Sequence, residues 1–393
     1  MKVGLVCLAL AYVLSQFYRV FLAVLTPTLI KDLGITPGDL AISSGLWFMA
    51  FALMQFPVGW ALDHIGPRRT AAWLMGVGGA GGALVFALAQ GPMALHLSMV
   101  LIGMGCSPTL MASYYIFARI YSPKVFGTLA GATVGVGSLG NILGATPLAW
   151  LIGAVGWRET LAGLAGVTLI VSILIYLLVR DPDRLGGERR VEGSLLDVIG
   201  IRALWPIMAL MLVAYAPAAV IRGLWAGPFF SDVYGADTLK IGTATLVMGL
   251  AMVVGNFAMG PLDRLTGSRK WGVVAGVFLS VICLAVLVLW PDIGQWSAIW
   301  FLAGHGMFGA TFGGIMSHGR SFLPPHLIGR GVSFINMFAI GGAGILQFAS
   351  RPVYRIASEA GDPVHTFRMV FLTFLVPLCI GLVIYLFSRD NRV

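Results

Sequence analysis

The stretch Gly59–Arg69 reads GWALDHIGPRR, so an acid, a histidine and two arginines stand close together around a glycine and a proline. Two stretches without Asp, Glu, Lys or Arg enclose this charged segment, 40–62 before it and 70–118 after it. A helix that crosses a lipid bilayer needs about 20 predominantly apolar residues. The sequence therefore predicts a short polar turn at Asp63–Arg69 between two membrane-spanning helices.

The composition of the whole chain agrees with a lipid environment. Of its 393 residues 58% are hydrophobic and only 10% are charged, and the mean hydropathy is +0.91. A soluble domain carries about a quarter charged residues, so a cytosolic enzyme and a nucleic-acid-binding protein are excluded. The four cysteines lie far apart in apolar stretches, in a pattern that fits neither a disulfide framework nor a metal site.

Twelve spans follow from the uncharged stretches. The stretch 70–118 is long enough for two spans and breaks at Gln90–Pro92, and two more spans contain one internal arginine each. The remaining stretches have the length of one helix: 40–62, 125–157, 160–179, 241–262, 271–291, 293–319, 331–350 and 369–388, with 3–30 and 203–231 as the spans that contain arginine. None of them alternates in polarity, so we expect helices rather than transmembrane strands. The predicted fold class is an all-α membrane protein with twelve transmembrane helices.

Orientation follows from the Lys and Arg residues in the loops. With the N-terminus inside, 17 of the 25 lie on the inner side, 6 on the outer side and 2 within spans. Both termini are therefore predicted to be cytoplasmic, and the net charge of +9 reflects membrane topology rather than nucleic-acid binding. The polar segment 180–202 predicts a cytoplasmic linker between an N-terminal bundle, 1–179, and a C-terminal bundle, 203–393.

The two halves resemble each other in sequence. Tyr12 and Arg19 in the first span correspond to Tyr215 and Arg222 in the seventh, and Asp63 after the second span corresponds to Asp263 after the eighth. Weak internal similarity of this kind is typical of transporters built from duplicated halves. It predicts two pseudo-symmetric six-helix bundles.

GWALDHIGPRR resembles the G-x-x-x-D-R-x-G-R-R signature of the major facilitator superfamily, and the segment from Asp263, DRLTGSRK, resembles its degenerate second copy. His64 departs from the pattern, because the family usually has Arg or Lys there. The resemblance implies transport by alternating access, no cofactor and a monomer. It also implies a charged latch at the cytoplasmic ends of the two bundles, built from Gly59, Asp63, Gly66, Arg68, Arg69, Asp263 and Arg264.

Arg19 and Arg222 lie near the middle of their spans, where a charge is costly and usually functional. Helical spacing places Tyr12 and Gln16 on the same face as Arg19. Tyr215 and Trp225 share a similar face with Arg222. In the family the first and seventh spans line the central cavity, so the resemblance implies that these two helix faces lie on opposite sides of it.

No Asp or Glu lies deep in any span, so the simplest counter-charge for the two arginines is an anionic substrate. Arg grips carboxylate or phosphate through two parallel bonds. The alternative is that each Arg binds backbone carbonyls of a broken helix. His305, at the middle of the tenth span, is a further substrate-site candidate that can carry a proton; a neutral histidine bonded between helices is the alternative. Trp47 is interpreted as a packing residue.

Three segments resemble the anion:cation symporters of the same superfamily: Phe17–Arg19, Leu33–Ile35 and the longer stretch 51–60, FALMQFPVGW. In that group an Arg in the first span, and in some members another in the seventh, binds the carboxylate of the substrate. Many bacterial members have Asp just before the first Arg as a proton site, whereas this chain has Tyr18. The resemblance therefore supports carboxylate recognition but not that route of proton coupling.

Together these observations predict a secondary active or facilitative transporter of a small organic anion, in a bacterial inner membrane, coupled to H⁺, to Na⁺ or to neither. Membrane lipid is the other expected partner, and no nucleic acid is expected. Efflux of amphipathic drugs or metabolites is the alternative function. A non-transporting membrane scaffold or sensor is a hypothesis from another class. No constellation of residues indicates an enzyme, a catalytic residue or a metal site.

Overall fold

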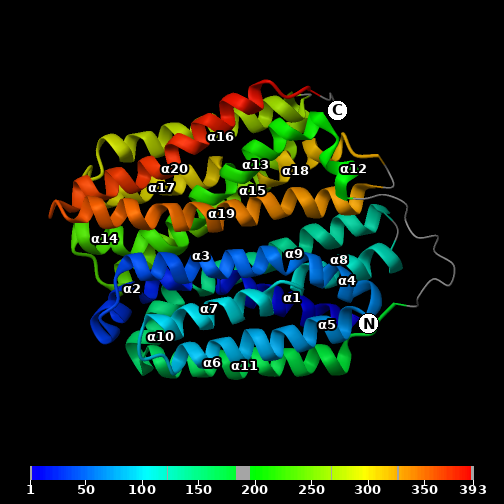
Figure 1. The fold of residues 1–393 in the computed structure, drawn as a ribbon, viewed down its shortest axis with the longest axis horizontal. Coiled ribbons are helices and arrows are strands. Elements are labelled where there is room, and N and C mark those ends of the chain that lie inside the picture. The colour runs from blue at the N-terminus through cyan, green and yellow to red at the C-terminus, as the bar shows by residue number, and fades with distance from the viewer. Residues whose placement is uncertain (1, 122, 183–194, 267, 325–326, 391–393) are drawn as a thin grey trace. The chain divides into compact units, whose positions relative to one another are not determined.

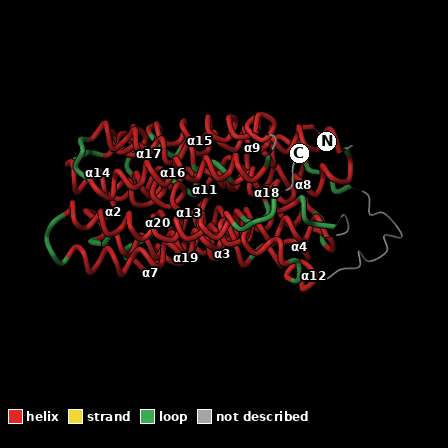
Figure 2. Tube along the Cα trace, turned by 90° about the horizontal axis from the view of Figure 1, so that it is seen from above, coloured by secondary structure: helices red, strands yellow, loops and turns green. Residues whose placement is uncertain are grey.

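A computed structural model of the chain describes residues 2–121, 123–182, 195–266, 268–324 and 327–390. Helices make up almost all of these ranges, and no strand is assigned within them (Figure 2). The described residues divide into two compact units, Met1–Arg184 with Ala236–Leu246, and Leu185–Gly235 with Val247–Val393. Residues 183–194 of the predicted linker lie outside the described residues.

The first unit contains the helices up to α11 (Figure 1). They are α1 Lys2–Phe17, α2 Phe21–Leu33, α3 Pro37–Leu53, α4 Gln55–His64, α5 Pro67–Trp73, the π-helix η1 Leu74–Ala80, α6 Gly81–Ala87, α7 Pro92–Cys106, α8 Thr109–Ile120, α9 Pro123–Leu143, α10 Thr146–Val155 and α11 Trp157–Leu178.

The second unit contains the remaining helices, of which α15 begins in the first unit. They are α12 Leu195–Ile199, the 3₁₀ turn η2 Arg202–Leu204, α13 Trp205–Val220, the π-helix η3 Ile221–Trp225, α14 Ala226–Tyr234, α15 Thr238–Thr266, α16 Arg269–Leu289, α17 Gln295–Phe308, α18 Phe312–Arg320, α19 Ile328–Ser358 and α20 Pro363–Leu386.

The helices agree with the predicted spans. Within the described residues, nine helical segments are long and apolar enough to cross a membrane, and two bent pairs raise the number to eleven. One of these pairs, Val3–Phe17 with Phe21–Leu33, is the first predicted span and bends by 48°. The predicted span 331–350 is helical as well and lies within α19, whose ends carry Arg330, Arg351 and Arg355.

Local signals set several helix ends. Thr36 and Asp39 form a capping box at the start of α3, and Pro37 occupies the first turn, where its missing N–H costs nothing. Gly34 and Gly235 close α2 and α14 with φ of 61° and 62°, a left-handed conformation that glycine adopts without strain. These two glycines are equivalent in the internal repeat, so the turns after the first and seventh spans have the same construction.

The packing of the helices is also repeated. In the first unit α1 packs on α9 and α11, and in the second unit the equivalent α13 packs on α19 and α20. One glycine permits the α1–α9 contact, and another permits the α13–α19 contact. A Cβ on Gly140 would collide with the carbonyl oxygen of Val13, and a Cβ on Gly342 would collide with that of Leu212. Small residues at such contacts let transmembrane helices approach closely.

Gly342 offers a direct test because its neighbour Gly341 faces open space. Both positions lie in α19, so replacing either glycine by alanine gains the same helix propensity. We expect Gly342→Ala to destabilise the protein by roughly 1–3 kcal/mol through overpacking. Gly341→Ala is expected to leave stability unchanged or slightly raised. The melting temperatures of the two variants in detergent compare these effects, and equal values would contradict the close α13–α19 contact.

Candidate functional site

Arg19 lies in a break of the first span. Helix α1 ends at Phe17 and α2 begins at Phe21. Between them the Arg19 N–H donates to the carbonyl of Gln16 at 3.3 Å and the Val20 N–H to that of Phe17 at 3.1 Å. These bonds close shorter rings than the bonds of an α-helix. The irregular backbone that the alternative interpretation of Arg19 requires is therefore present.

Two aromatic rings of α3 hold the Arg19 side chain. The guanidinium carbon lies 5.3 Å from the ring centre of Trp47 and 5.0 Å from that of Phe51, within range of a cation–π interaction. The two rings stack on each other, with centres 5.3 Å apart. The Nε1 of Trp47 is buried without a hydrogen-bond partner among the described residues. Trp47 is thus a neighbour of Arg19 and not only the packing residue that its sequence context indicated.

Tyr12 and Gln16 are joined by a hydrogen bond. The Gln16 amide donates to the Tyr12 hydroxyl at 2.9 Å, so these two side chains are neighbours on α1. Helix α1 ends at Phe17, so the regular spacing behind their predicted common face with Arg19 does not extend to that residue. The ring of Tyr12 is buried and packs against Gly137 of α9, where a Cβ would overlap it.

Arg222 lies in the π-helix η3, which interrupts the seventh span between α13 and α14. Only 2% of its surface is exposed. A Cβ on Gly249 of α15 would lie 2.7 Å from a terminal nitrogen of the guanidinium, so this glycine provides the space that Arg222 fills. Tyr215 of α13 packs against Phe312 of α18, with ring centres 6.1 Å apart. Single-turn π-helices are frequent at functional sites.

Trp225 belongs to a packed aromatic cluster of the second unit. Its indole N–H donates to the Ser350 hydroxyl at 3.1 Å, and its ring lies 5.0 Å from that of Tyr354 and 6.4 Å from that of Phe367. The π-helix changes the number of residues per turn between Arg222 and Trp225, so the regular helical spacing behind their predicted common face does not hold in this segment.

His305 is buried on α17 and bonds to Ser280 of α16. Its Nδ1 lies 2.8 Å from the Ser280 hydroxyl and 3.1 Å from the Ser280 carbonyl. A carbonyl can only accept, and the Ser280 hydroxyl itself donates to the His305 carbonyl at 3.0 Å. Nδ1 is therefore the donor, which assigns its hydrogen from the bonding pattern. Nε2 is left as the acceptor of the neutral ring, and it is buried without a partner among the described residues.

Arg222 and His305 are related through α15. Gly249, which receives Arg222, lies within one turn of Met252. Met252 in turn packs against Gly306, the residue after His305. The two ionisable side chains are therefore carried at a similar level of the second unit by helices that pack on the same part of α15.

The segment Gly59–Arg69 forms the end of α4, a turn and the start of α5. Gly66 has φ of 102°, and a Cβ there would lie 2.9 Å from the carboxylate of Asp181, which lies three residues after the end of α11. The backbone N–H of Arg68 donates to this carboxylate at 2.7 Å, and the Arg68 side chain lies 3.9 Å from it. Asp181 is a partner that sequence reasoning missed, because nothing in its own sequence context points to a residue 113 positions away.

For some of the other predicted latch residues the structure describes only the backbone. Gly59 is exposed in α4, with open space where a Cβ would stand, and the Arg69 side chain is exposed on α5. Asp63 lies in α4, and Asp263 and Arg264 lie in α15, but their side chains fall outside the described part of the structure. Among the residues searched for a metal site, no group of three or more His, Cys, Asp or Glu side chains comes together.

Several bacterial proteins are similar to this chain at low sequence identity. An uncharacterised transporter of Bacillus subtilis (strain 168) is 23% identical over 63% of this chain, and the match spans 61% of that protein. A protein of Escherichia coli (strain K12) named "Probable galactarate/D-glucarate transporter" is 22% identical over 74% of each chain. A multidrug resistance protein B homologue of Mycobacterium tuberculosis is 30% identical, over 53% of this chain and 38% of that protein.

The fold is shared with solved transporter structures. A D-xylose–proton symporter superposes with a TM-score of 0.78 at 14% identity, over 98% of this chain and 97% of that chain. A family profile described as Major Facilitator Superfamily matches residues 8–347, which include the signature GWALDHIGPRR and most of both units. The chain belongs to the major facilitator superfamily and is an integral membrane transporter rather than an enzyme.

Proposed function

We propose that the chain carries a small organic anion with a carboxylate group, and that Arg19 and Arg222 bind it. The supporting observation is that two arginines at equivalent positions of the internal repeat each lie where the backbone of a span departs from the α-helix. Charged residues at such depth are retained in membrane proteins for substrate or ion pathways. Irregular helices at mid-span are a common setting for transporter binding sites.

The surroundings of Arg19 favour an anion over a cation. The guanidinium and the Trp47 indole N–H are both donors, and the indole N–H is buried without an acceptor among the described residues. A carboxylate offers acceptor lone pairs to both groups, whereas a cationic ligand would meet the positive charge of Arg19. A buried donor left without an acceptor costs about 1–3 kcal/mol, which a bound anion would recover.

The relatives divide between two substrate classes. Galactarate and glucarate, in the name of the E. coli relative, are carboxylates and fit the proposal. The multidrug relative has the higher identity but matches only half of this chain. The absence of Asp and Glu from the middle of the spans gives a lipophilic cation no counter-charge there, so the sequence favours the anion. Efflux of amphipathic compounds is tested as the second outcome below.

We further propose that His305 takes part in transport through Nε2. This atom is a buried acceptor that can receive either a proton or a substrate hydroxyl. Coupling to H⁺ would then involve the second unit, which carries His305 as well as Arg222. The position before Arg19, where related symporters have Asp, holds Tyr18, and its hydroxyl is hydrogen-bonded to Thr168 at 2.9 Å.

The predicted latch is retained as a proposal with one addition. Gly66, Arg68 and Asp181 form a charged cluster within the first unit, and Asp63, Asp263 and Arg264 are proposed to complete the latch with Gly59 and Arg69. The cytoplasmic location of this end, a bacterial inner membrane, a monomer and the bundle limits 1–179 and 203–393 remain predictions from the sequence.

The substrate proposal is tested by thermal stabilisation of the detergent-purified protein with small carboxylates, inorganic anions and lipophilic cations. A ligand at 100 times its Kd stabilises the folded state by about 2.7 kcal/mol. We expect one class of carboxylate to raise the melting temperature, and Arg19→Gln and Arg222→Gln each to remove this rise. Arg355→Gln, at an exposed arginine near the end of α19, is the control that loses the same charge.

Two outcomes would count against this proposal. Stabilisation by lipophilic cations alone would favour efflux of amphipathic compounds. Undiminished stabilisation by carboxylates in both arginine variants would leave the arginines with the structural role of supporting broken helices.

His305 is tested by a pair of variants. His305→Asn places an amide donor near Ser280 but removes the Nε2 acceptor, whereas His305→Ala removes both. If Nε2 acts in transport, His305→Asn should melt within a few degrees of the unchanged protein and still lose uptake or its dependence on a pH gradient in proteoliposomes. Normal uptake by His305→Asn with an unaltered pH dependence would mean that only the bond to Ser280 matters.

The contribution of Asp181 to stability is compared with that of the Arg68 side chain. Asp181→Ala removes both the bond to the Arg68 N–H and the ion pair, and loss of such a cap costs about 0.5–2 kcal/mol. Arg68→Gln keeps the backbone N–H bond and removes an ion pair whose side chains are about one-third exposed, worth at most about 1 kcal/mol. It also removes the contact of the guanidinium with the Tyr176 ring, 5.5 Å from the guanidinium carbon to the ring centre. Asp181→Ala should therefore lower the melting temperature more than Arg68→Gln does. The reverse order would show that the side-chain contacts of Arg68, and not the cap, stabilise this turn.

A further inference from the structure

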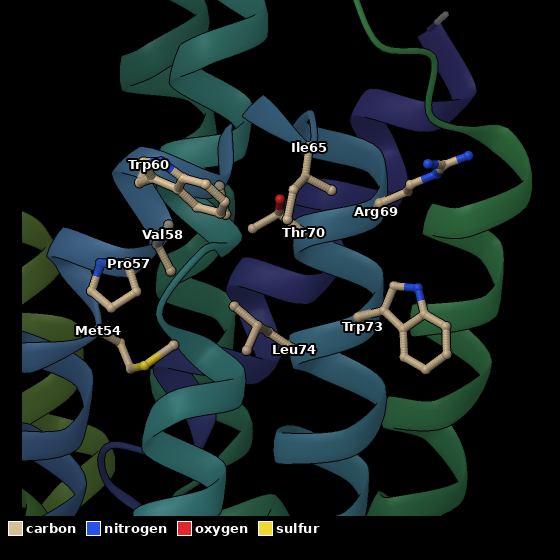
Figure 3. A pocket seen from close by; sticks show the side chains of 10 residues that line it. Met54, Pro57, Val58, Trp60, Ile65, Arg69, Thr70, Trp73 and Leu74 are labelled. Atoms are coloured by element: carbon tan, nitrogen blue, oxygen red, sulfur yellow. The ribbon is translucent and has the colours of Figure 1, made fainter. Parts of the chain in front are cut away.

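A pocket of about 320 Å³ lies between α4 and α5 of the first unit (Figure 3). Its lining is almost entirely apolar, and Figure 3 shows the Arg69 side chain directed away from it. The Thr70 hydroxyl at its wall is itself buried. This pocket therefore presents no group that would select a ligand. The polar contact that bears on function lies elsewhere in the same unit, between Tyr18 and Thr168.

Tyr18 is completely buried, and its hydroxyl bonds to another span. The Tyr18 oxygen lies 2.9 Å from the Thr168 hydroxyl of α11. Thr168 donates its own hydrogen to the carbonyl of Leu164 at 2.7 Å, so Tyr18 is the donor of the bond between them. Ser172, one turn further along α11, donates to the carbonyl of Ala72 in α5 at 2.8 Å. The helix that receives the Tyr18 hydroxyl is thus itself tied to a further span.

Tyr18 lies at the point where the first span changes its winding. Its N–H donates to the carbonyl four residues back, as in an α-helix, whereas the N–H of Arg19 donates to the carbonyl three residues back. The Tyr18 ring meets the rings of Phe17 and Phe21 edge-on, with centres 5.7 Å apart in each case. Phe17 ends α1 and Phe21 begins α2, so a ring that is fixed on α11 contacts both halves of the broken span.

The Arg19 side chain leaves this turn toward a different helix. Its guanidinium lies over the rings of Trp47 and Phe51 of α3, whereas the Tyr18 hydroxyl bonds to α11. Because the peptide group between Tyr18 and Arg19 is planar, fixing the first residue restricts the directions open to the second.

The Tyr18 hydroxyl is not needed to fill space. A phenylalanine would keep the ring contacts with Phe17 and Phe21, and hydrogen bonds between transmembrane helices add little to stability on average. What the hydroxyl adds is a fixed point on α11 for the turn that carries Arg19.

We propose that Tyr18 is a positioning residue for the anion site. Its bond to Thr168 holds the break of the first span in the winding that directs Arg19 onto the aromatic rings of α3. Tyr18 acts through Arg19 and does not itself touch the anion. The inference rests on the proposed role of Arg19 in substrate binding. It requires the hydroxyl to decide where the guanidinium lies rather than whether the protein folds.

The test is ¹⁹F NMR of the full-length protein in detergent, labelled with 5-fluorotryptophan. The chain has 11 tryptophans, and the variant Trp47→Phe identifies the signal of Trp47. Arg19→Gln gives the position of that signal without a guanidinium over the ring. We expect Tyr18→Phe to move the Trp47 signal toward this position while the remaining signals stay in place. The melting temperature of Tyr18→Phe should fall by no more than a few degrees.

Two variants of the acceptor separate orientation from packing. Thr168→Ser keeps the hydroxyl that receives the Tyr18 bond and should leave the Trp47 signal in place. Thr168→Val removes this acceptor and should move the Trp47 signal at least as far as Tyr18→Phe does.

Thr160→Val is the matched control on the same helix. The Thr160 hydroxyl also donates to the carbonyl four residues back, but it takes no bond from another span among the described residues. Tyr234→Phe removes a tyrosine bond of 2.6 Å to a carbonyl in the second unit. The proposal is overturned if Tyr18→Phe leaves the Trp47 signal unmoved, or if Thr160→Val moves it as far as Thr168→Val does.

The consequence for anion binding is read from melting temperatures in titrations with acetate, succinate, citrate and gluconate. The carboxylate that stabilises the unchanged protein should be needed at roughly tenfold higher concentration in Tyr18→Phe, because a misdirected donor loses its bond to the anion. Equal affinities of Tyr18→Phe and Tyr234→Phe would contradict the proposal. If Arg19→Gln leaves the affinity unchanged, the anion proposal fails, while the NMR comparison needs no ligand and still decides whether Tyr18 positions Arg19.

Discussion

Inside a bilayer the backbone has no water to bond, so a helix can be interrupted only where protein supplies the missing partners. This constraint governs the centre of each unit. The first span is interrupted at Arg19 by a tight turn, and the seventh is widened at Arg222 by a π-helix. Both interruptions occur at the one arginine of the span, and in both cases a neighbouring helix shapes the space around its side chain.

The two supports differ in chemistry. At Arg19 the second span contributes aromatic rings, whose faces attract a cation without neutralising it. At Arg222 the eighth span leaves space, because Gly249 has no side chain and the guanidinium fits against its backbone. A glycine has the same role in the turn after the second span, where Gly66 leaves room for the carboxylate of Asp181. Small or aromatic residues of neighbouring segments therefore surround the side chains of Arg19, Arg222 and Asp181.

Apolar run length and loop charge were sufficient to predict the helices, since both are local properties of the sequence. The internal repeat was readable from matching residues such as Arg19 and Arg222, and the structure adds the equivalent glycines Gly140 and Gly342, which permit close helix contacts in both halves. The break at Arg19, the π-helix at Arg222 and the roles of Trp47, Gly249 and Asp181 were not predictable. Each depends on a segment far away in the sequence, and a lone tryptophan, glycine or aspartate carries no mark of its partner.

The difference between the two interruptions has a consequence for the geometry of recognition. A 3₁₀-type turn has fewer residues per turn than an α-helix and a π-turn has more, so each changes the direction of the side chains that follow it. Arg19 and Arg222 are equivalent in sequence, yet the backbone is wound more tightly than an α-helix at Arg19 and more loosely at Arg222. The internal repeat therefore preserves an arginine at both positions but neither the backbone conformation nor the neighbours that surround it.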